Sequence, residues 1–308
     1  METRRIGKLE VSVIGLGCNN FGWKIDEKAT GDVIDAALSS GINFLDTADT
    51  YGKTKSEEFI GRALEGRRES VIIATKFGKP VDATRTGAKP AYVHQACNDS
   101  LRRLRTDYID LYQLHAPDRT VPIADTLGAL NELVIAGKVR EIGCSNFSAA
   151  QLREANEAST HDGLAHFVSV QNHYNLLRRD DEAYVIPECG RLDLAYLPYF
   201  PLESGLLTGK FRMGEDAPPG TRIAEGGWLA EKFTEENLAT IERLIGYAES
   251  RQHTLLELAI SWLLRLPVVA SVIAGTTTVE QVRANAAAPN WKLSSADILA
   301  IDEILSGA

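Results

Sequence analysis

Residues 41–78, GINFLDTADTYGKTKSEEFIGRALEGRRESVIIATKFG, contain one complete strand–helix–strand unit. Short aliphatic runs at 42–45 and 71–75 predict two strands, and the amphipathic segment 56–64 between them predicts a helix. Strands joined through a helix of this kind run parallel within one sheet. The same alternation continues on both sides of this unit, and it predicts the fold.

Eight strands are predicted along the chain, each with a longer helical pattern after it or before the next strand. No tract rich in proline, serine or glycine divides the sequence, so we expect residues 1–308 to form a single domain. The predicted fold is an α/β (β/α)8 TIM barrel. The predicted strands are Val13–Leu16, Ile42–Leu45, Val71–Thr75, Tyr108–Gln113, Val139–Gly143, Phe167–Val170, Leu192–Leu197 and Val269–Ala274. The predicted helices are Lys28–Ser40, Ser56–Leu64, Pro90–Leu104, Ile123–Gly137, Ala149–Ala158, Arg179–Cys189 and Leu255–Leu266.

Three further segments complete the prediction. Residues 4–11 alternate around Gly7 and predict an N-terminal β-hairpin that closes the bottom of the barrel. Residues 211–233 are rich in glycine, proline and charge, and they form a long loop before the last strand. A connection of this length suggests a functional loop. A helix over 294–305 ends the chain.

An open doubly wound sheet is the alternative architecture. It normally carries a GxGxxG turn that opens the helix after its first strand. The nearest match here, beginning at Gly15 and Gly17, lacks the third glycine and is followed by Phe21-Gly-Trp23 rather than by a helix. If a dinucleotide binds, another kind of site must hold it.

Composition excludes several classes of function. The net charge of −9 counts against a nucleic acid or an anionic membrane surface as the main partner. No signal peptide or run of about 18 apolar residues is present, so we expect a cytoplasmic protein. The four cysteines are widely spaced without a CxxC pair, which predicts free thiols.

Polar side chains follow three consecutive predicted strands. Asp46 and Tyr51 follow the second strand, Lys76 the third and His115 the fourth. Any one of them could be a helix cap or a solvated residue. In a parallel barrel, however, the carboxyl ends of the strands meet at one mouth, where catalytic groups lie. We therefore expect these four side chains to converge.

The four residue types suit hydride transfer to a carbonyl, whose oxygen must gain a proton. Tyr51 is the natural acid, and an adjacent Lys76 cation would favour its phenolate and lower its pKa. A buried lysine needs a carboxylate to stay charged, and Asp46 is expected to provide it. His115 would orient the carbonyl and bind the developing oxyanion.

These residues lie in sequence motifs that resemble the aldo-keto reductase family. The motifs are GINFLDTADTYG from Gly41, Lys76, His115, GKVREIGCSNF from Gly137, VQN from Val170, GLLTGK from Gly205 and the segment 275–285. The resemblance implies a barrel that binds NAD(P)H in an extended pose across its mouth and reduces aldehydes or ketones to alcohols, with sugars and small aromatic carbonyls as candidate substrates.

The resemblance also implies which residues bind the cofactor. Ser145, Asn146 and Gln171 would hold the nicotinamide carboxamide, and Tyr199 would stack on the ring, although Phe200 replaces the small polar residue usual beside it. Positive charge would come from Lys210 or Arg212 in the long loop. The adenosine phosphates would lie against the last strand–helix unit, at Gly275, Thr276, Thr277, Gln281 and Asn285.

Cofactor choice and substrate are less determined. NADPH is the first choice by the habit of the family, but many NADPH-preferring relatives carry arginine or lysine near positions 275, 277 or 281. This chain has glycine, threonine and glutamine there, so NADH or dual use stays open. Trp23, Phe77 and Trp228 are expected to line the pocket of a small-molecule carbonyl substrate. The sequence does not indicate an oligomeric state.

Two other functions are alternatives for this sequence. The same family includes potassium-channel β-subunits, so a cofactor-binding, non-catalytic regulatory partner is the main alternative; the intact set of four polar residues favours an enzyme. A metal-dependent barrel hydrolase would need clustered ligands. Of six histidines only His115 and His173 fall near strand ends, so no metal site is predicted.

Overall fold

The computed structural model describes residues 1–226 and 230–307, and its centre is a barrel of eight parallel strands. The strands are hydrogen-bonded in the order β10-β3-β4-β5-β6-β7-β8-β9. Tyr196 closes the remaining side, because its N–H donates to Val268 O and its carbonyl accepts from Ala270 N. The predicted TIM barrel is confirmed. The strands are β3 (Ile14–Gly17), β4 (Phe44–Asp46), β5 (Ile72–Phe77), β6 (Ile109–Leu114), β7 (Val139–Ser145), β8 (Phe167–His173), β9 (Ala195–Tyr199) and β10 (Val272–Gly275).

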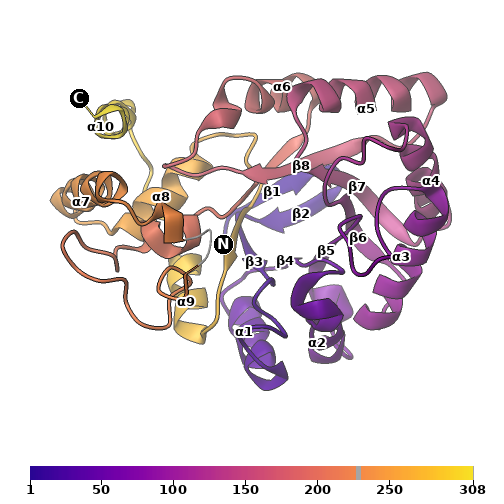
Figure 1. The fold of residues 1–308 in the computed structure, drawn as a ribbon, viewed down its shortest axis with the longest axis horizontal. Coiled ribbons are helices and arrows are strands. Elements are labelled where there is room, and N and C mark those ends of the chain that lie inside the picture. The colour runs from indigo at the N-terminus through magenta and orange to yellow at the C-terminus, as the bar shows by residue number, and fades with distance from the viewer. Residues whose placement is uncertain (227–229, 308) are drawn as a thin grey trace.

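Helices surround this barrel, as Figure 1 shows in a view close to its axis. Two further helices, α7 (Glu235–Ser250) and α10 (Ser295–Ser306), lie next to each other outside the ring. The helices of the ring are α1 (Glu27–Ser39), α2 (Lys55–Ala63), α3 (Pro90–Leu104), α4 (Ile123–Ile135), α5 (Ala149–Asp162), α6 (Val185–Leu192), α8 (Leu255–Leu264) and α9 (Val279–Ala287).

The structure differs from the sequence prediction at a few elements. Helix α7 was not predicted, although Thr234 caps it and apolar residues from Leu238 to Ala248 mark its buried face. The predicted helix 179–189 splits into a 3₁₀ turn, Asp180–Glu182, and α6, which has Pro187 in its first turn. Because α6 continues to Leu192, strand β9 begins later than predicted.

The N-terminal hairpin plugs the bottom of the barrel. Strands β1 (Thr3–Ile6) and β2 (Leu9–Ser12) pair antiparallel, with Gly7 in the left-handed region at φ 55°. Ile6 and Val11 are fully buried in one cluster with inward-facing residues of the barrel strands. The predicted hairpin is therefore confirmed, and it leaves the opposite end of the barrel as the open mouth.

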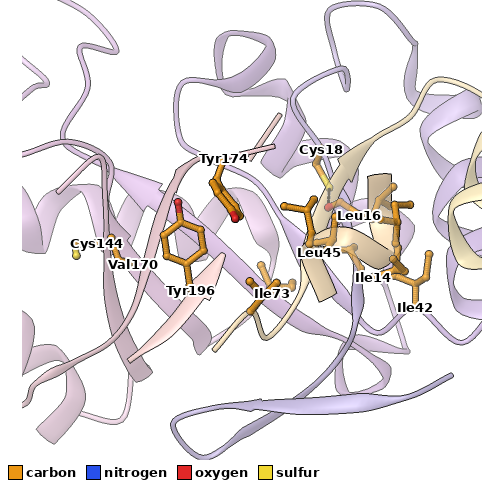
Figure 2. Packing of buried hydrophobic residues seen from close by; sticks show 14 of the residues in the cluster. Ile14, Leu16, Cys18, Ile42, Leu45, Ile73, Cys144, Val170, Tyr174 and Tyr196 are labelled. Atoms are coloured by element: carbon orange, nitrogen blue, oxygen red, sulfur yellow. Dashed lines mark hydrogen bonds between the residues drawn. The ribbon is translucent and has the colours of Figure 1, made fainter. Parts of the chain in front are cut away.

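Side chains alternate in direction along each strand, and this alternation determines which residues point inward near the mouth. Phe44, Ala74 and Leu111 belong to the cluster inside the barrel. Asp46, Lys76 and Gln113, two residues further along each strand, therefore point inward near the mouth. The alternate residues pack outward against the helices; Figure 2 shows part of this layer, including Leu16 of β3 and Leu45 of β4.

The predicted long connection lies between β9 and α7. Over the predicted residues 211–233 it contains, where described, the 3₁₀ segment Ala230–Lys232 and no other helix or strand. Another 3₁₀ segment, Glu203–Thr208, precedes it. The four cysteines are buried and unpaired. No helix in the described part of the chain is long and apolar enough to cross a membrane.

Candidate active site

Asp46 and Lys76 form a buried ion pair at the mouth of the barrel. Lys76 Nζ lies 2.6 Å from Asp46 Oδ2 and also donates to Thr47 O at 2.8 Å. Lys76 is 0% and Asp46 3% exposed. Burial works against the charge of Lys76, but Asp46 and Tyr51 together raise its pKa. The lysine is therefore held as a cation, as the sequence analysis expected of this pairing.

Tyr51 lies on a tight turn directly above this pair. Lys76 Nζ is 5.1 Å from the centre of the Tyr51 ring. The turn continues through Gly52 at φ 57°, where a Cβ would lie 2.2 Å from Phe21 O, so only glycine fits there. Burial raises the pKa of Tyr51, and Lys76 opposes that rise without reversing it. The lowered pKa predicted from the lysine charge alone is wrong, because desolvation of the phenol has the larger effect.

His115 lies beside Tyr51, with the two rings edge to face at 5.9 Å. It is 5% exposed. Burial, followed by the charges of Lys76 and Lys79, lowers the pKa of His115 to about 2. The buried ring therefore favours its neutral form, and its Nδ1 has no hydrogen-bond partner in the described structure. A neutral imidazole at this place can position an oxygen but cannot supply a cationic charge.

Two glutamines donate hydrogen bonds to Asp46 Oδ1, the carboxylate oxygen that Lys76 does not bind. Gln171 Nε2 donates to Asp46 Oδ1 at 2.8 Å, and Gln113 Nε2 does so at 3.3 Å. Gln113 was not singled out from the sequence, although it ends a predicted strand. Because its Nε2 is engaged, Gln171 retains Oε1 as the atom able to accept a hydrogen bond from a carboxamide.

Ser145, Asn146 and Tyr199 are linked to one another at the next strand ends. Ser145 Oγ donates to Gln171 O at 2.7 Å, and Asn146 Nδ2 donates to Ser145 Oγ at 3.0 Å and to His115 O at 2.9 Å. Tyr199 OH donates to Asn146 Oδ1 at 2.8 Å. The structure therefore brings together the four residues assigned to the nicotinamide end.

Tyr199 is supported from behind by residues that the sequence analysis did not assign. Its ring stacks on His173 at 5.3 Å, and His173 Nε2 lies 3.0 Å from Glu203 Oε2. Glu203 is 2% exposed and also accepts from Asn175 Nδ2 at 2.5 Å. These contacts fix one face of the tyrosine.

The long loop brings a cation to the mouth that the sequence analysis missed. Arg222 Nη2 donates to Asn20 Oδ1 at 2.5 Å and to Asn19 Oδ1 at 3.3 Å. Burial lowers the pKa of Arg222; burial and then the charge of Arg222 lower the pKa of Lys210. Within residues 1–226 and 230–307, neither cation forms an ion pair with a carboxylate. Arg212, expected as another source of charge, is bound instead by Glu242 at 2.9 Å.

The residues assigned to the adenosine phosphates lie at the end of β10 and on α9. Thr276 is 2% exposed, its Oγ1 lacks a partner in the described structure, and its carbonyl accepts from Asn20 Nδ2 at 3.0 Å. Gln281 Oε1 accepts from Thr277 N at 2.8 Å. Gly275 is exposed and Asn285 is buried on α9. Positions 275, 277 and 281 are glycine, threonine and glutamine, so none of them carries a positive charge.

The aromatic residues predicted to contact the substrate differ in their exposure and position. Trp23 is 59% exposed at the mouth, 5.8 Å from the Arg222 guanidinium. Phe77 is 0% exposed and stacks on Tyr112 at 4.7 Å in the layer beneath the helices. Because it follows the inward-facing Lys76, it points to the opposite face of the barrel, so the prediction that it lines the mouth is corrected. Trp228 lies outside the described residues.

A pocket of about 810 Å³ lies beside the four predicted catalytic residues. Asn146, His173 and Tyr199 line it, together with residues of the α5 and α6 ends, but Asp46, Tyr51, Lys76 and His115 do not. In the described part of the chain, no three His, Cys, Asp or Glu side chains are grouped so that they could hold a metal ion.

The model of the aldo/keto reductase family matches residues 13–306, which is nearly the whole chain. The chain belongs to the aldo-keto reductase family. Members of this family are oxidoreductases of carbonyl compounds that use NAD(P)H as cofactor.

Individual relatives agree with this assignment. This aldo-keto reductase is 34% identical to a probable aldo-keto reductase 1 of Glycine max, over 96% of its own length and 85% of the relative. It is 35% identical to the aldo-keto reductase YhdN of Bacillus subtilis (strain 168), over 96% and 91% of the two chains. Among solved structures, a glycerol dehydrogenase of Gluconobacter oxydans matches with a TM-score of 0.86 and 31% identity, covering 99% of this chain and 95% of the other.

Proposed function

We propose that this aldo-keto reductase reduces aldehydes or ketones to alcohols with NADPH, and that Tyr51 donates the proton. The observation that carries the proposal is the buried Lys76–Asp46 pair, with the Tyr51 ring 5.1 Å from the lysine nitrogen. A cation in this position favours the phenolate that remains after the proton is given up.

The residues at the mouth fit a dinucleotide. Lys210 and Arg222 lie close enough for Arg222 to lower the pKa of Lys210. Neither forms an ion pair with a carboxylate in the described structure, although the charge of Glu225 acts on Arg222 and partly offsets the effect of burial on its pKa. A pyrophosphate would neutralise two such cations. The unpartnered hydroxyl of Thr276 and the first turn of α9 would hold the adenosine phosphates.

Each side chain of the site has a separate part in the reaction. The bound cofactor supplies the hydride to the carbonyl carbon. Tyr51 donates its phenolic proton to the carbonyl oxygen, which acquires the charge. Lys76 stabilises the resulting phenolate, and Asp46 keeps Lys76 charged in a buried position. His115, neutral and beside Tyr51, positions the carbonyl oxygen for the proton.

The substrate class is proposed as small carbonyls, including short hydroxyaldehydes. Trp23 offers an apolar wall, while His115 and Tyr51 offer hydrogen bonds to one oxygen. The structural neighbour is named a glycerol dehydrogenase, so glycerol and glyceraldehyde are direct test compounds, alongside aromatic aldehydes.

The first experiment titrates the purified protein separately with NADPH and NADH, following quenching of tryptophan fluorescence, and then adds an aldehyde. We expect NADPH to bind more tightly and its absorbance at the nicotinamide band to fall after the aldehyde is added. Equal affinity would show that the threonine hydroxyls near α9 do not select the extra phosphate. Binding without turnover of any carbonyl would favour the regulatory alternative, and binding of neither nucleotide would refute the proposal.

Replacement of the loop cations should weaken cofactor binding. A charge-assisted hydrogen bond to phosphate is worth about 1.5–3 kcal/mol, so Arg222→Gln or Lys210→Gln should raise the cofactor Kd roughly 10- to 150-fold. Arg212→Gln is the matched control, because this arginine lies in the same connection but is bound to Glu242. Its Kd should stay near the wild-type value. A similar loss in all three variants would indicate a general effect of charge rather than contacts with the phosphates.

A further inference from the structure

Asp49 is buried in the loop between Asp46 and Tyr51, and its carboxyl has no hydrogen-bond partner in the described structure. The residue is 1% exposed, and both side-chain oxygens lack a hydrogen bond within the described structure. Its backbone N–H donates to Lys76 O at 3.0 Å, and Tyr51 N–H donates to Ala48 O at 3.2 Å. A buried polar group without a partner is costly, and an unpaired buried charge costs more.

The charged groups around Asp49 come from three neighbouring elements and are already paired. Glu57 of α2 binds Arg103 of α3 at 2.6 Å and accepts from Thr75 Oγ1 at 2.6 Å. Lys76 of β5 is paired with Asp46. The two cations, Lys76 and Arg103, are each paired with another carboxylate, and neither forms an ion pair with Asp49 in the described structure.

The remaining titratable neighbours do not change this balance. They are Tyr92 of α3 and Tyr112 of β6, both of which have a pKa raised first by burial and then by neighbouring groups that include Asp49. The Tyr112 hydroxyl is itself buried without a partner in the described part of the chain. Burial, and next the charge of Glu57, raise the pKa of Asp49 to about 7, while Arg103 and Lys76 act in the opposite direction.

We propose that Asp49 is a positioning residue that carries a proton in the working enzyme, and that loss of this proton weakens Tyr51 as the donor and gives carbonyl reduction an alkaline limit. The inference rests on the proposed function, in which Tyr51 is the acid. An ionised Asp49 interacts with the charge of Lys76, the cation that favours the Tyr51 phenolate. It therefore leaves less of that charge to stabilise the negative charge that develops on the phenol during donation.

The pH dependence of kcat tests this assignment at saturating cofactor and aldehyde. Wild-type kcat should fall about three- to tenfold between pH 6 and pH 8.5, since a nearby charge of this kind shifts a phenol by up to about one pKa unit. Asp49→Asn has nearly the same shape and is permanently neutral, so the fall over this range should be lost. An unchanged fall in Asp49→Asn would overturn the proposal.

Glu57→Gln should shift the profile in the opposite sense. This substitution removes the acid nearest to Asp49 and releases Arg103, so the pKa of Asp49 should decrease. The fall in kcat should then begin at a lower pH than in the wild type. If the pH profile of kcat changed in the same direction in Asp49→Asn and in Glu57→Gln, the cluster would act only through general stability. That result would also overturn the proposal.

A second readout needs no turnover. Between about pH 4 and pH 7 the unfolded chain has released the Asp49 proton and the folded protein retains it, so the Asp49 contribution to stability decreases as pH rises through this window. The difference in Tm between Asp49→Asn and wild type should therefore grow with pH. A Tm difference that stayed constant with pH would overturn the proposal that Asp49 is protonated, even if the protein reduced carbonyls. A Tm difference that grew with pH in a protein without turnover would show that only the proposed function had failed.

Discussion

Tyr51→Phe should lower kcat for aldehyde reduction by about 10²–10⁴-fold, the range that a positioned general acid contributes. Phenylalanine retains the ring that packs beside His115 and above Lys76, and it removes only the hydroxyl. The phenol acts on the carbonyl oxygen as charge develops, so the loss should appear in kcat and in kcat/KM alike. The measurement is steady-state reduction of an aromatic aldehyde, together with fluorescence titration of the cofactor.

The cofactor Kd separates this role from a structural one. It should stay within about threefold of wild type, because Tyr51 is not among the residues assigned to the nicotinamide or the phosphates. Tyr199→Phe is a matched control that also removes one phenolic hydroxyl at the mouth, where it binds Asn146. It should affect cofactor binding more than proton donation. Loss of cofactor binding in Tyr51→Phe would mean that the acid has been misassigned.

Lys76→Met should lower both stability and activity. The methionine fills a similar volume but leaves Asp46 as a buried carboxylate without its cation, and removal of one partner from a buried pair costs about 3–5 kcal/mol. The hydrogen bonds from Gln171 and Gln113 to Asp46 place the expected loss near the lower end of that range. Urea unfolding followed by tryptophan fluorescence measures the stability, and kcat should fall about as far as in Tyr51→Phe.

A double variant distinguishes the two effects of Lys76. Asp46→Asn combined with Lys76→Met removes both charges, so most of the lost stability should return. Activity should not return, because no cation is left to stabilise the Tyr51 phenolate. Recovery of activity together with stability would show that the lysine matters only for folding, and equal stability of all variants would contradict the buried pair itself.

Much of the fold could be predicted because its signals are local. The strand runs and helix stripes in residues 41–78 reappear as β4, α2 and β5, and the bend at Gly7 reappears in the hairpin. The helix α7 was missed even though Thr234 and its apolar stripe were readable, because no element was predicted between the loop that ends at residue 233 and the helix that begins at Leu255. The start of β9 was misplaced because α6 extends further than its sequence pattern indicates.

The candidate site divides in the same way. The four polar residues after successive strands were predictable, since the mouth of a parallel barrel gathers the carboxyl ends of its strands. The contact of Arg222 with Asn19 and Asn20 was not, because it joins segments about two hundred residues apart through an irregular loop. The raised pKa of Tyr51 was also missed, because desolvation depends on the atoms that pack around the phenol.

The sequence by itself determined the repeating strand–helix order, the barrel that follows from it and the chemical types present at its mouth. Only the tertiary structure decided that Phe77 turns away from the mouth, that Gln171 and Gln113 both bind Asp46, and that Asp49 is left without a cation. The physical reason is the range of the interactions. Periodicity along the chain sets each element locally, whereas burial and the pairing of charges depend on which distant residues the closed barrel brings into contact.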